Sequence, residues 1–553
     1  MTESQAAAPA REEPGLRTVV GASAAGTAFE WYDFFIFGSL TTIIARHFYA
    51  DVGEGTSYIL ALLTFGVGFV VRPLGALVFG WFGDRTGRKA TFLVTITLMG
   101  LATVLIGVLP DYDAIGIAAP VLLILLRILQ GFALGGEYGG AAIYVAEHAP
   151  PKRRGFLTGW IQTTAAFGLM GALSVILVTR MIVGVEAFDA WGWRIPFILS
   201  ALLLVVSLWI RLKLNESPAF KRMEAESTER RAPYREAFAT WRNGKWVLVA
   251  LVGIMFAQGA VWYAGYFYTR FFMERVLKVD VAIVDQLILG ITVASAVLYV
   301  FFGWLSDKVG RKPVMLGGMI LALVAFFPGF HALTQAANPA LAQAQASAPV
   351  IVVADPAACA VQFDPVGKAA FASSCDIAKS VLSNAGVSYA NRAAPTGSVA
   401  MVHIGETVVA SAEGTGMDAA ALKATRGEVE GRIKAALTTA GYPTRADPAR
   451  MNLPAVFGIL MIFMIAATAV YGPQAAALVE LFPTRVRYTA MSLPYNIGTG
   501  WVGGLLPAAS FALVAWSGDI YFGLWYAVAF TAVAAVVAFF FLPETRGRDL
   551  DAI

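Results

Sequence analysis

The sequence predicts an all-α membrane protein whose twelve transmembrane helices form two pseudo-symmetric six-helix bundles, with a small α+β insertion between helices 9 and 10. Three observations support this fold class. The 553 residues are 58% hydrophobic and 14% charged, whereas soluble proteins average roughly 45–50% apolar and about 25% charged residues. Apolar runs near the ~20 residues needed to cross a bilayer recur along the chain. A charged turn between two such runs occurs twice.

The repeated turn occupies residues 80–89 and 303–312, which are identical at six of ten positions and lie 223 residues apart. Each copy contains one aspartate, at least two glycines and three basic residues. A charged turn repeated between apolar runs indicates two homologous halves, with the turn on the same side of the membrane in each.

The spans are expected to be helices because a spanning backbone must satisfy its own hydrogen bonds, and the sequence has no alternating barrel pattern. We expect spans at 18–45, 57–82, 91–110, 117–147, 156–182, 195–214, 245–272, 283–305, 314–334, 452–477, 488–516 and 520–542. The expected units are a tail (1–17), the N-terminal bundle (18–214), a linker (215–244), the C-terminal bundle in two parts (245–334 and 452–542), the insertion (335–451) and a second tail (543–553).

The distribution of basic residues predicts the orientation. With the N-terminus inside, the inside segments carry 24 Lys and Arg residues and the short outside loops carry 6. Because basic residues mark cytoplasmic loops, we expect both tails and the linker to be cytoplasmic. Residues 1–17 are polar, and the first apolar run is too long for a signal peptide. That run is therefore expected to act as an uncleaved anchor.

A second repeated turn locates the insertion. Residues 147–154 and 480–487 share an acid, a proline and two basic positions, at an offset of 333 residues. This offset is 110 residues longer than the first. About 110 extra residues must therefore lie between the second copies of the two turns, around 335–451. Because nine spans precede this loop and the N-terminus is inside, the loop is expected on the outside. We expect strands at 349–354 and 398–404 and a helix at 418–440.

Both cysteines of the chain, Cys359 and Cys375, fall in this insertion. An extracytoplasmic domain permits disulfides, so a Cys359–Cys375 bond is expected, with two free thiols as the alternative. His403 is a lone histidine, and we assign no metal site.

Ionisable residues inside spans are costly and are candidates for function. Glu30 and Asp33 are three residues apart and share a face of the first span. Two neighbouring carboxylates in a low dielectric resist joint ionisation, so one could carry a proton. The alternative is that they pair with a buried arginine and only hold helices together.

In the fourth span, Arg127, Gln130 and Glu137 share one face. Arg127 needs a carboxylate partner, which the first span or Glu137 could supply, and a guanidinium also suits an anionic substrate. A purely structural ion pair is the alternative. The glycines at 131, 135, 136, 139 and 140 are spaced for close helix packing.

Further polar and aromatic side chains are candidates for lining a cavity. Gln258, Trp262 and Tyr266 form a stripe at i, i+4 and i+8 of the seventh span, although such stripes also occur in cores. Weaker candidates are Tyr32, Gln162, Gln474 and Asn496. Arg72 of the second span is a candidate for a gate.

The repeated turn suggests a cytoplasmic gate formed by Asp84, Arg85, Arg88, Asp307 and Arg311. A fixed acid with nearby arginines can bridge to a neighbouring helix end and close that side. The alternative is that the turn only sets topology, but topology requires basic residues and neither the aspartate nor the glycines.

Several function classes lack support. The net charge of +4 is split between loops, which gives no indication of nucleic-acid binding. The sequence has no phosphate-binding Gly-Lys-Ser/Thr loop, and no cluster of nucleophiles or metal ligands. We therefore expect no enzyme and no cofactor.

The motif at 80–89 resembles the loop 2–3 signature of the major facilitator superfamily. Within it, residues 29–34 (FEWYDF) and the RxxQGxxxGGExGG pattern at 127–140 resemble the metabolite:proton symporter family. This resemblance implies a major facilitator fold and proton-coupled uptake of a small organic acid or zwitterion by alternating access. It also implies a monomer in the bacterial inner membrane, driven by the proton gradient.

Two short motifs leave a sugar porter or uncoupled facilitator open as the alternative. They are residues 215–218 (NESP) and 543–547 (PETRG), which are also similar to those of sugar porters. The insertion departs from the family pattern, so a transporter-like sensor with the insertion as its receiver is a further, weaker alternative.

Overall fold

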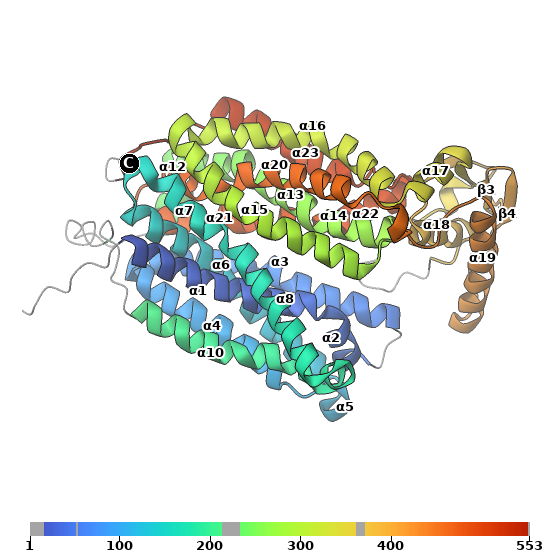
Figure 1. Ribbon diagram of the computed structural model, residues 1–553, viewed down its shortest axis with the longest axis horizontal. Helices are drawn as coiled ribbons and strands as arrows, with labels where there is room; N and C mark the ends of the chain where they lie inside the picture. Colours follow the sequence, from blue (N-terminus) through green and yellow to red (C-terminus); the bar gives the residue numbers. More distant parts are fainter. Residues whose placement is uncertain (1–15, 51–53, 213–219, 221–232, 361–370, 551–553) are drawn as a thin grey trace, which may run out of the picture.

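The computed structural model describes residues 16–50, 54–212, 220, 233–360 and 371–550. Two layers of long helices lie side by side, the first half of the chain in one layer and the second half in the other, with the insertion at one end (Figure 1). The expected cytoplasmic tail (1–17) and linker (215–244) lie largely outside the described residues.

The first half consists almost entirely of helices that span the layer. Their bounds are α1 Leu16–Ser39, α2 Thr41–Phe48, α3 Glu54–Thr86, α4 Arg88–Val108, α5 Tyr112–Ile115, α6 Ala118–His148, η1 Pro151–Arg153, α7 Arg154–Gln162, α8 Thr164–Val183, α9 Val185–Ala187, η2 Phe188–Gly192 and α10 Arg194–Leu212. The first and fifth expected spans are each interrupted, at Leu40 and at Thr163.

The second half repeats this plan, with π-helical turns inside two spans. Its bounds are η3 Arg235–Ala239, α12 Trp241–Ala250, η4 Leu251–Met255, α13 Phe256–Tyr263, η5 Ala264–Tyr268, α14 Thr269–Phe271, η6 Phe272–Val276, α15 Val281–Val309, α16 Arg311–Ala337, α20 Leu453–Val479, α21 Arg487–Asn496, η9 Ile497–Gly503, α22 Leu506–Ser517 and α23 Leu524–Phe541.

Within the described part of the chain, 11 helical segments are long and apolar enough to cross a membrane. Helix α1 is not among them, because Glu30, Asp33 and several small or hydroxyl-bearing residues lower its hydropathy. The count of twelve spans therefore remains a prediction.

The repeated turns are shorter than the sequence suggests. Helices α3 and α4 are separated only by Gly87, and α15 and α16 only by Gly310. Both glycines have φ values, 105° and 113°, that favour glycine. We call the end of the molecule that holds these two turns the turn end. The insertion lies at the opposite end (Figure 1).

The small residues of α6 serve packing, as expected. A Cβ atom on Gly131 would lie 2.1 Å from the Gly68 carbonyl oxygen of α3, and one on Gly135 would lie 2.2 Å from the Arg72 carbonyl oxygen. The backbones of α3 and α6 therefore touch directly, which only glycine permits.

The insertion forms a four-stranded sheet in the order β2-β1-β3-β4, with β1 and β2 parallel and the other neighbours antiparallel. The expected strands and helix are present as β1 Val350–Ala354, β3 Met401–Ile404 and α19 Ala419–Thr439. Six further elements were not predicted: α17 Pro339–Ser347, α18 Ser374–Ala385, β2 Tyr389–Ala393, β4 Thr407–Ala410, η7 Pro356–Ala358 and η8 Pro448–Arg450.

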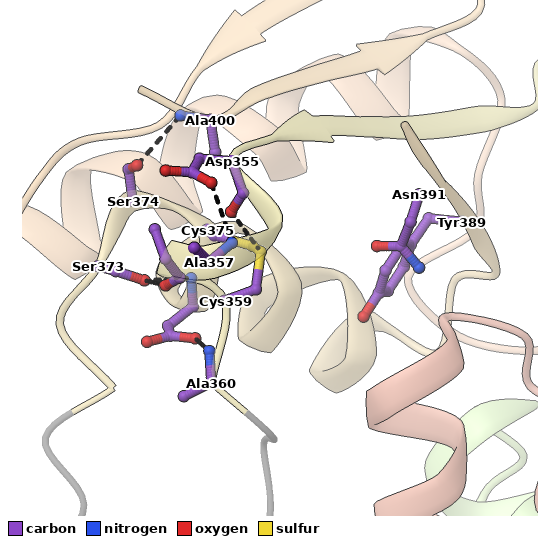
Figure 2. The surroundings of a disulfide bond; sticks show 12 residues. Asp355, Ala357, Cys359, Ala360, Ser373, Ser374, Cys375, Tyr389, Asn391 and Ala400 are labelled. Atoms are coloured by element: carbon purple, nitrogen blue, oxygen red, sulfur yellow. Dashed lines mark hydrogen bonds between the residues drawn. A yellow bond between two sulfur atoms is a disulfide. The ribbon is translucent and has the colours of Figure 1, made fainter. Parts of the chain in front are cut away.

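Cys359 and Cys375 form a disulfide, with their Cα atoms 5.3 Å apart. It joins the segment after β1 to the start of α18 (Figure 2). Ser373 caps α18 by accepting the Asp376 N–H at 3.1 Å, and Asp355 caps η7 by accepting the Ala357 N–H at 2.9 Å. The disulfide therefore links two locally capped segments.

The insertion is bonded to the second half of the chain. Tyr389 donates its N–H to the Gly518 carbonyl at 2.8 Å and its hydroxyl to the Ala515 carbonyl at 3.1 Å. Asn391 donates to the Ser517 carbonyl at 2.8 Å. Strand β2 thus lies against the end of α22.

Candidate functional site

Arg127 is fully buried inside the first half. Its Nη1 donates to Gln130 Oε1 at 2.6 Å, and its guanidinium lies 4.2 Å from the centre of the Phe37 ring. No carboxylate among the described residues forms an ion pair with it. The expectation that Glu137 or the first span pairs with Arg127 is therefore wrong, because a glutamine and aromatic faces stabilise the guanidinium instead.

Asp33 is linked to Arg127 only through intermediates. Gln130 Nε2 donates to Thr103 Oγ1 at 2.7 Å, and Thr103 also hydrogen-bonds to Asp33. Asp33 Oδ1 accepts a further bond from Ser200 of α10 at 2.5 Å. Tyr32, predicted to line a cavity, donates instead to the Pro196 carbonyl of α10 at 3.0 Å.

The carboxylates of Glu30 and Glu137 meet at Arg211 of α10. Arg211 Nη2 lies 2.5 Å from Glu137 Oε1 and 3.2 Å from Glu30 Oε1. Glu137 Oε2 also accepts from Thr95 at 2.9 Å. All three charged side chains are 1–2% exposed. Sequence patterns do not single out Arg211, because it lies near the linker among the basic residues expected on the cytoplasmic side.

Aromatic side chains connect the two halves. The rings of Tyr138 on α6 and Tyr495 on α21 stack 3.6 Å apart. The hydroxyls of Tyr495 and Tyr471 are 3.2 Å apart. Tyr138 accepts bonds from two predicted cavity residues, Gln162 at 2.7 Å and Gln474 at 3.4 Å.

A small cavity lies next to this aromatic group. The predicted residues Trp262 and Tyr266 both line it and stack on each other 5.4 Å apart. Trp262 Nε1 donates to Tyr299 at 2.7 Å. The remaining lining comes from both halves: Phe35, Ala165, Ala166, Leu169, Thr292 and Ser295. Gln258, the third residue of the predicted stripe, is buried elsewhere in the same span.

Arg72 of α3 is fully buried where α3 meets α21. Its Nε donates to Asn496 Oδ1 at 3.0 Å, and its guanidinium lies 5.7 Å from the centre of the Tyr495 ring. In the described part of the chain, Arg72 Nη1 and Nη2 make no hydrogen bond of good geometry, although the side chains of Tyr263 and Tyr495 lie within reach of the guanidinium. The predicted residue Asn496 also donates to the Gly135 carbonyl at 2.8 Å, so it ties α21 to α6.

At the turn end, each half caps a helix of the other. Asp84 of α3 accepts the Tyr488 and Thr489 N–H groups at the start of α21, at 3.2 and 2.8 Å. Asp307 of α15 accepts the Gly155 and Phe156 N–H groups at the start of α7, at 2.9 and 2.7 Å. These first-turn N–H groups have no partner within their own helix.

Arginines complete the contacts at the turn end. Arg88 and Arg487 flank Glu147 at 3.6 and 2.7 Å, and Arg154 and Arg311 flank Glu480 at 2.8 and 3.2 Å. Each glutamate therefore bonds to both halves.

Arg85 differs from the other predicted gate residues. It is exposed, and its guanidinium stacks over Trp81, four residues earlier in its own helix, at 4.6 Å. The second repeated turn, which was not predicted to belong to the gate, supplies Glu147, Arg154, Glu480 and Arg487.

This arrangement can hold charge between two helical bundles and can close one end of the space between them. It contains buried arginines, carboxylates and aromatic faces from both halves. Among the described residues, no three His, Cys, Asp or Glu side chains are grouped as a metal would require.

Residues 18–235 and 376–553 match the family model "Sugar (and other) transporter", and residues 140–360 match "MFS/sugar transport protein". The chain belongs to the sugar (and other) transporter family. Members of this family are transporters of the major facilitator superfamily rather than enzymes.

Named relatives are transporters of small organic solutes. The chain is 34% identical to the proline/betaine transporter of Escherichia coli over 325 residues, covering 57% of this chain and 64% of the relative. It is 35% identical to the shikimate transporter of E. coli, covering 56% of this chain and 71% of the relative. The chain therefore spans a little under two thirds of the first of these relatives.

Solved structures show the same fold. The proton:xylose symporter XylE bound to 6-bromo-6-deoxy-D-glucose aligns with a TM-score of 0.59 at 16% identity, covering 97% of this chain and 98% of that chain. At this identity the likeness establishes the helical major facilitator fold alone.

Proposed function

We propose that this protein is a proton-coupled symporter that takes up a small organic acid or zwitterion by alternating access. It would act as a monomer in the bacterial inner membrane, with both tails cytoplasmic and the proton gradient in place of a cofactor. The turn end would then face the cytoplasm, and the two aspartate caps would close that side in the present state. The insertion would lie outside the cell.

The substrate class is inferred from the surroundings of Arg72. The two Nη atoms of this buried guanidinium, which make no hydrogen bond of good geometry, can together donate to the two oxygens of a carboxylate. Burying these N–H groups without a partner is costly. A substrate carboxylate would remove this cost in the bound state. Arg72 belongs to the first half and bonds to Asn496 of the second, so the substrate would be held where the halves must separate.

Aromatic side chains extend the site in a way that suits a cation. Tyr495, next to Arg72, is connected to three further aromatic side chains: its hydroxyl meets that of Tyr471, the Tyr471 ring packs on Tyr299, and Trp262 donates to the Tyr299 hydroxyl. Aromatic faces attract ammonium groups, including quaternary ones. A zwitterion could thus place its carboxylate on Arg72 and its cationic end on these rings. The substrates in the names of the relatives, proline, betaine and shikimate, all carry a carboxylate.

Proton coupling rests on the charge balance of one buried group beside α1. Two buried carboxylates, Glu30 and Glu137, share one buried arginine, Arg211. An unbalanced buried charge is costly, so this group favours binding one proton.

Uptake into proteoliposomes tests the proposal. With an inward proton gradient, labelled proline, glycine betaine or shikimate should accumulate, and a protonophore should abolish accumulation. Arg72→Lys keeps the charge but loses the bidentate fork, and should lower uptake at least tenfold. Arg85→Gln is the matched control and should transport normally. Accumulation of xylose, equilibration without a gradient, or binding without flux would instead indicate a sugar porter, a facilitator or a sensor, and would overturn the proposal.

A further inference from the structure

We infer that Glu30 is the residue that carries the transported proton, and that Arg211 is the fixed cation that Glu30 and Glu137 share. This inference rests on the proposed proton coupling and narrows it to one carboxyl group. It also assigns a role to an arginine that the sequence patterns do not single out.

Glu30, Glu137 and Arg211 form a buried triad with more carboxylates than arginines. Arg127 and Asp33 balance each other through Gln130 and Thr103, as described above. Arg211 faces two carboxylates, both within 3.2 Å of its Nη2. With both ionised, the three side chains would carry one net negative charge in a site that is almost fully buried. One proton makes the triad neutral.

Hydrogen bonding decides which carboxyl group holds that proton. Glu137 accepts bonds from Arg211 Nη1, Arg211 Nη2 and Thr95, at 3.3, 2.5 and 2.9 Å. These donors favour its ionised form. Neither oxygen of Glu30 has a hydrogen-bond partner among the residues described. Glu30 is therefore the less stabilised anion and the better proton acceptor.

The other charged groups around α1 do not alter this assignment. Helix α1 packs against α2, α3, α4, α6, α7, α8 and α10. Helices α2, α4, α7 and α8 carry charged or titratable residues only near their ends: Arg46 and His47, Arg88 and Lys89, Arg154, and Arg180. Helix α3 contributes Arg72, which bonds to Asn496 of the second half, and its other charged residues lie near its ends. Helix α6 contributes Arg127 and Glu137, with Glu147 near its end, and α10 contributes Arg211, with Arg194 at its start. Within α1, the remaining carboxylate is Asp33, which already accepts bonds from Ser200 and Thr103.

A glycine on α1 makes room for the shared cation. A Cβ atom on Gly26 would lie 2.5 Å from Arg211 Nη2 and 2.7 Å from Arg211 Nε. Gly26 is one turn before Glu30, so the guanidinium lies across the bare backbone of that turn and reaches both glutamates. Gly26→Ala should displace Arg211 without changing any charge.

The proton step is simple. A proton entering from outside adds to the Glu30 carboxylate and gives a neutral carboxylic acid, and Arg211 remains bonded to Glu137. When the first half opens to the cytoplasm, Glu30 releases that proton and its carboxylate returns to the ion pair with Arg211. No bond other than the O–H bond forms or breaks.

Infrared difference spectroscopy on the purified full chain tests the assignment independently of transport. Raising the pH should remove the carbonyl band of a protonated carboxylic acid. That band should be absent in Glu30→Gln and present in the matched variant Asp33→Asn. Gly26→Ala should shift the pH at which it disappears, which loss of packing elsewhere would not do. A band that survives in Glu30→Gln, or no band in the parent protein, would overturn the inference.

Transport assays separate this inference from the proposed function. Glu30→Gln should retain substrate exchange between equilibrated compartments and lose gradient-driven accumulation by at least tenfold. If the parent protein shows no gradient-driven accumulation, the proposed function is wrong. If the parent accumulates substrate and Glu30→Gln accumulates it equally well, the proposed function stands and the role of Glu30 is wrong.

Discussion

Replacing Asp84 by asparagine should open the turn end. The carboxylate accepts two N–H groups at the start of α21, a helix of the other half. Asparagine has nearly the same shape but no charge and only one acceptor oxygen. One bond should therefore be lost and the other should weaken, while the variant still folds.

The expected magnitude follows from the two bonds. A hydrogen bond to a charged group contributes ~1.5–3 kcal/mol, and a neutral one ~0.5–1.5 kcal/mol. An anion at a helix N-terminus adds ~0.3–1 kcal/mol. Losing one bond, one charge and this interaction should destabilise the closed state by about 2–3 kcal/mol, which is roughly a 30- to 150-fold change in the opening equilibrium.

Thiol labelling can measure this change. Ser492 is fully buried on α21 and packs against Gly139 of the first half. Both cysteines of the chain are in the disulfide, so Ser492→Cys adds the only free thiol. Its maleimide labelling rate should rise with the opening equilibrium, by roughly 30- to 150-fold in Asp84→Asn on the same free-energy scale.

Two comparisons make the result decisive. Asp307→Asn disrupts the equivalent cap on α7 and should raise labelling in the same direction. Arg85→Gln removes an exposed charge of the same turn that stacks on its own helix, and should label at the parent rate. An unchanged labelling rate in Asp84→Asn would refute the view that this cap holds the turn end closed.

Three further predictions concern packing and the insertion. Gly131→Ala should prevent close packing of α3 and α6 and abolish folding, seen as loss of a monodisperse peak in size-exclusion chromatography, whereas Gly66→Ala, with open space at its Cβ position, should fold. Cys359→Ser should destabilise the insertion by about 3 kcal/mol, the value for a loop of this size, which limited proteolysis would show as cleavage within the insertion. Backbone N–H bonds lower the pKa of Asp355. The ionised Asp355 carboxylate therefore stabilises the insertion above the ordinary carboxyl pKa, and this stabilisation is lost as the pH falls through the lowered pKa. Asp355→Asn should remove this pH dependence from thermal unfolding.

Much of the fold could be predicted because it depends on patterns within single segments. The two copies of the charged turn indicated the repeat, and the difference between the two offsets located the insertion. The breaks at Leu40 and Thr163 and the π-helical turns could not be predicted, because they depend on how neighbouring helices pack. Strands β2 and β4 were missed because their short segments lack a clear alternation of apolar and polar residues.

The site was predicted in part for the same reason. Helical spacing placed Arg127, Gln130 and Glu137 on one face of the fourth span, and all three are buried, but it did not indicate that Glu30 and Glu137 both meet Arg211. Which arginine a carboxylate meets depends on the rotation and depth of separate helices, and Arg211 lies near a helix end where basic residues usually reach water. Similarly, the contacts of the Arg72 guanidinium with Asn496 and Tyr495 depend on how separate helices pack, which one segment does not encode.

The bonds from β2 to the end of α22 have a mechanical consequence. They make the insertion a rigid appendage of one half, attached beyond the end of its helices (Figure 1). In a rotation of one half against the other, a point moves in proportion to its distance from the axis. Helix α19, at the far side of the insertion, would therefore move further than the membrane helices of the half that holds the insertion. A fluorophore on α19 paired with one at the outer end of the first half would therefore convert a small rotation into a large change of distance.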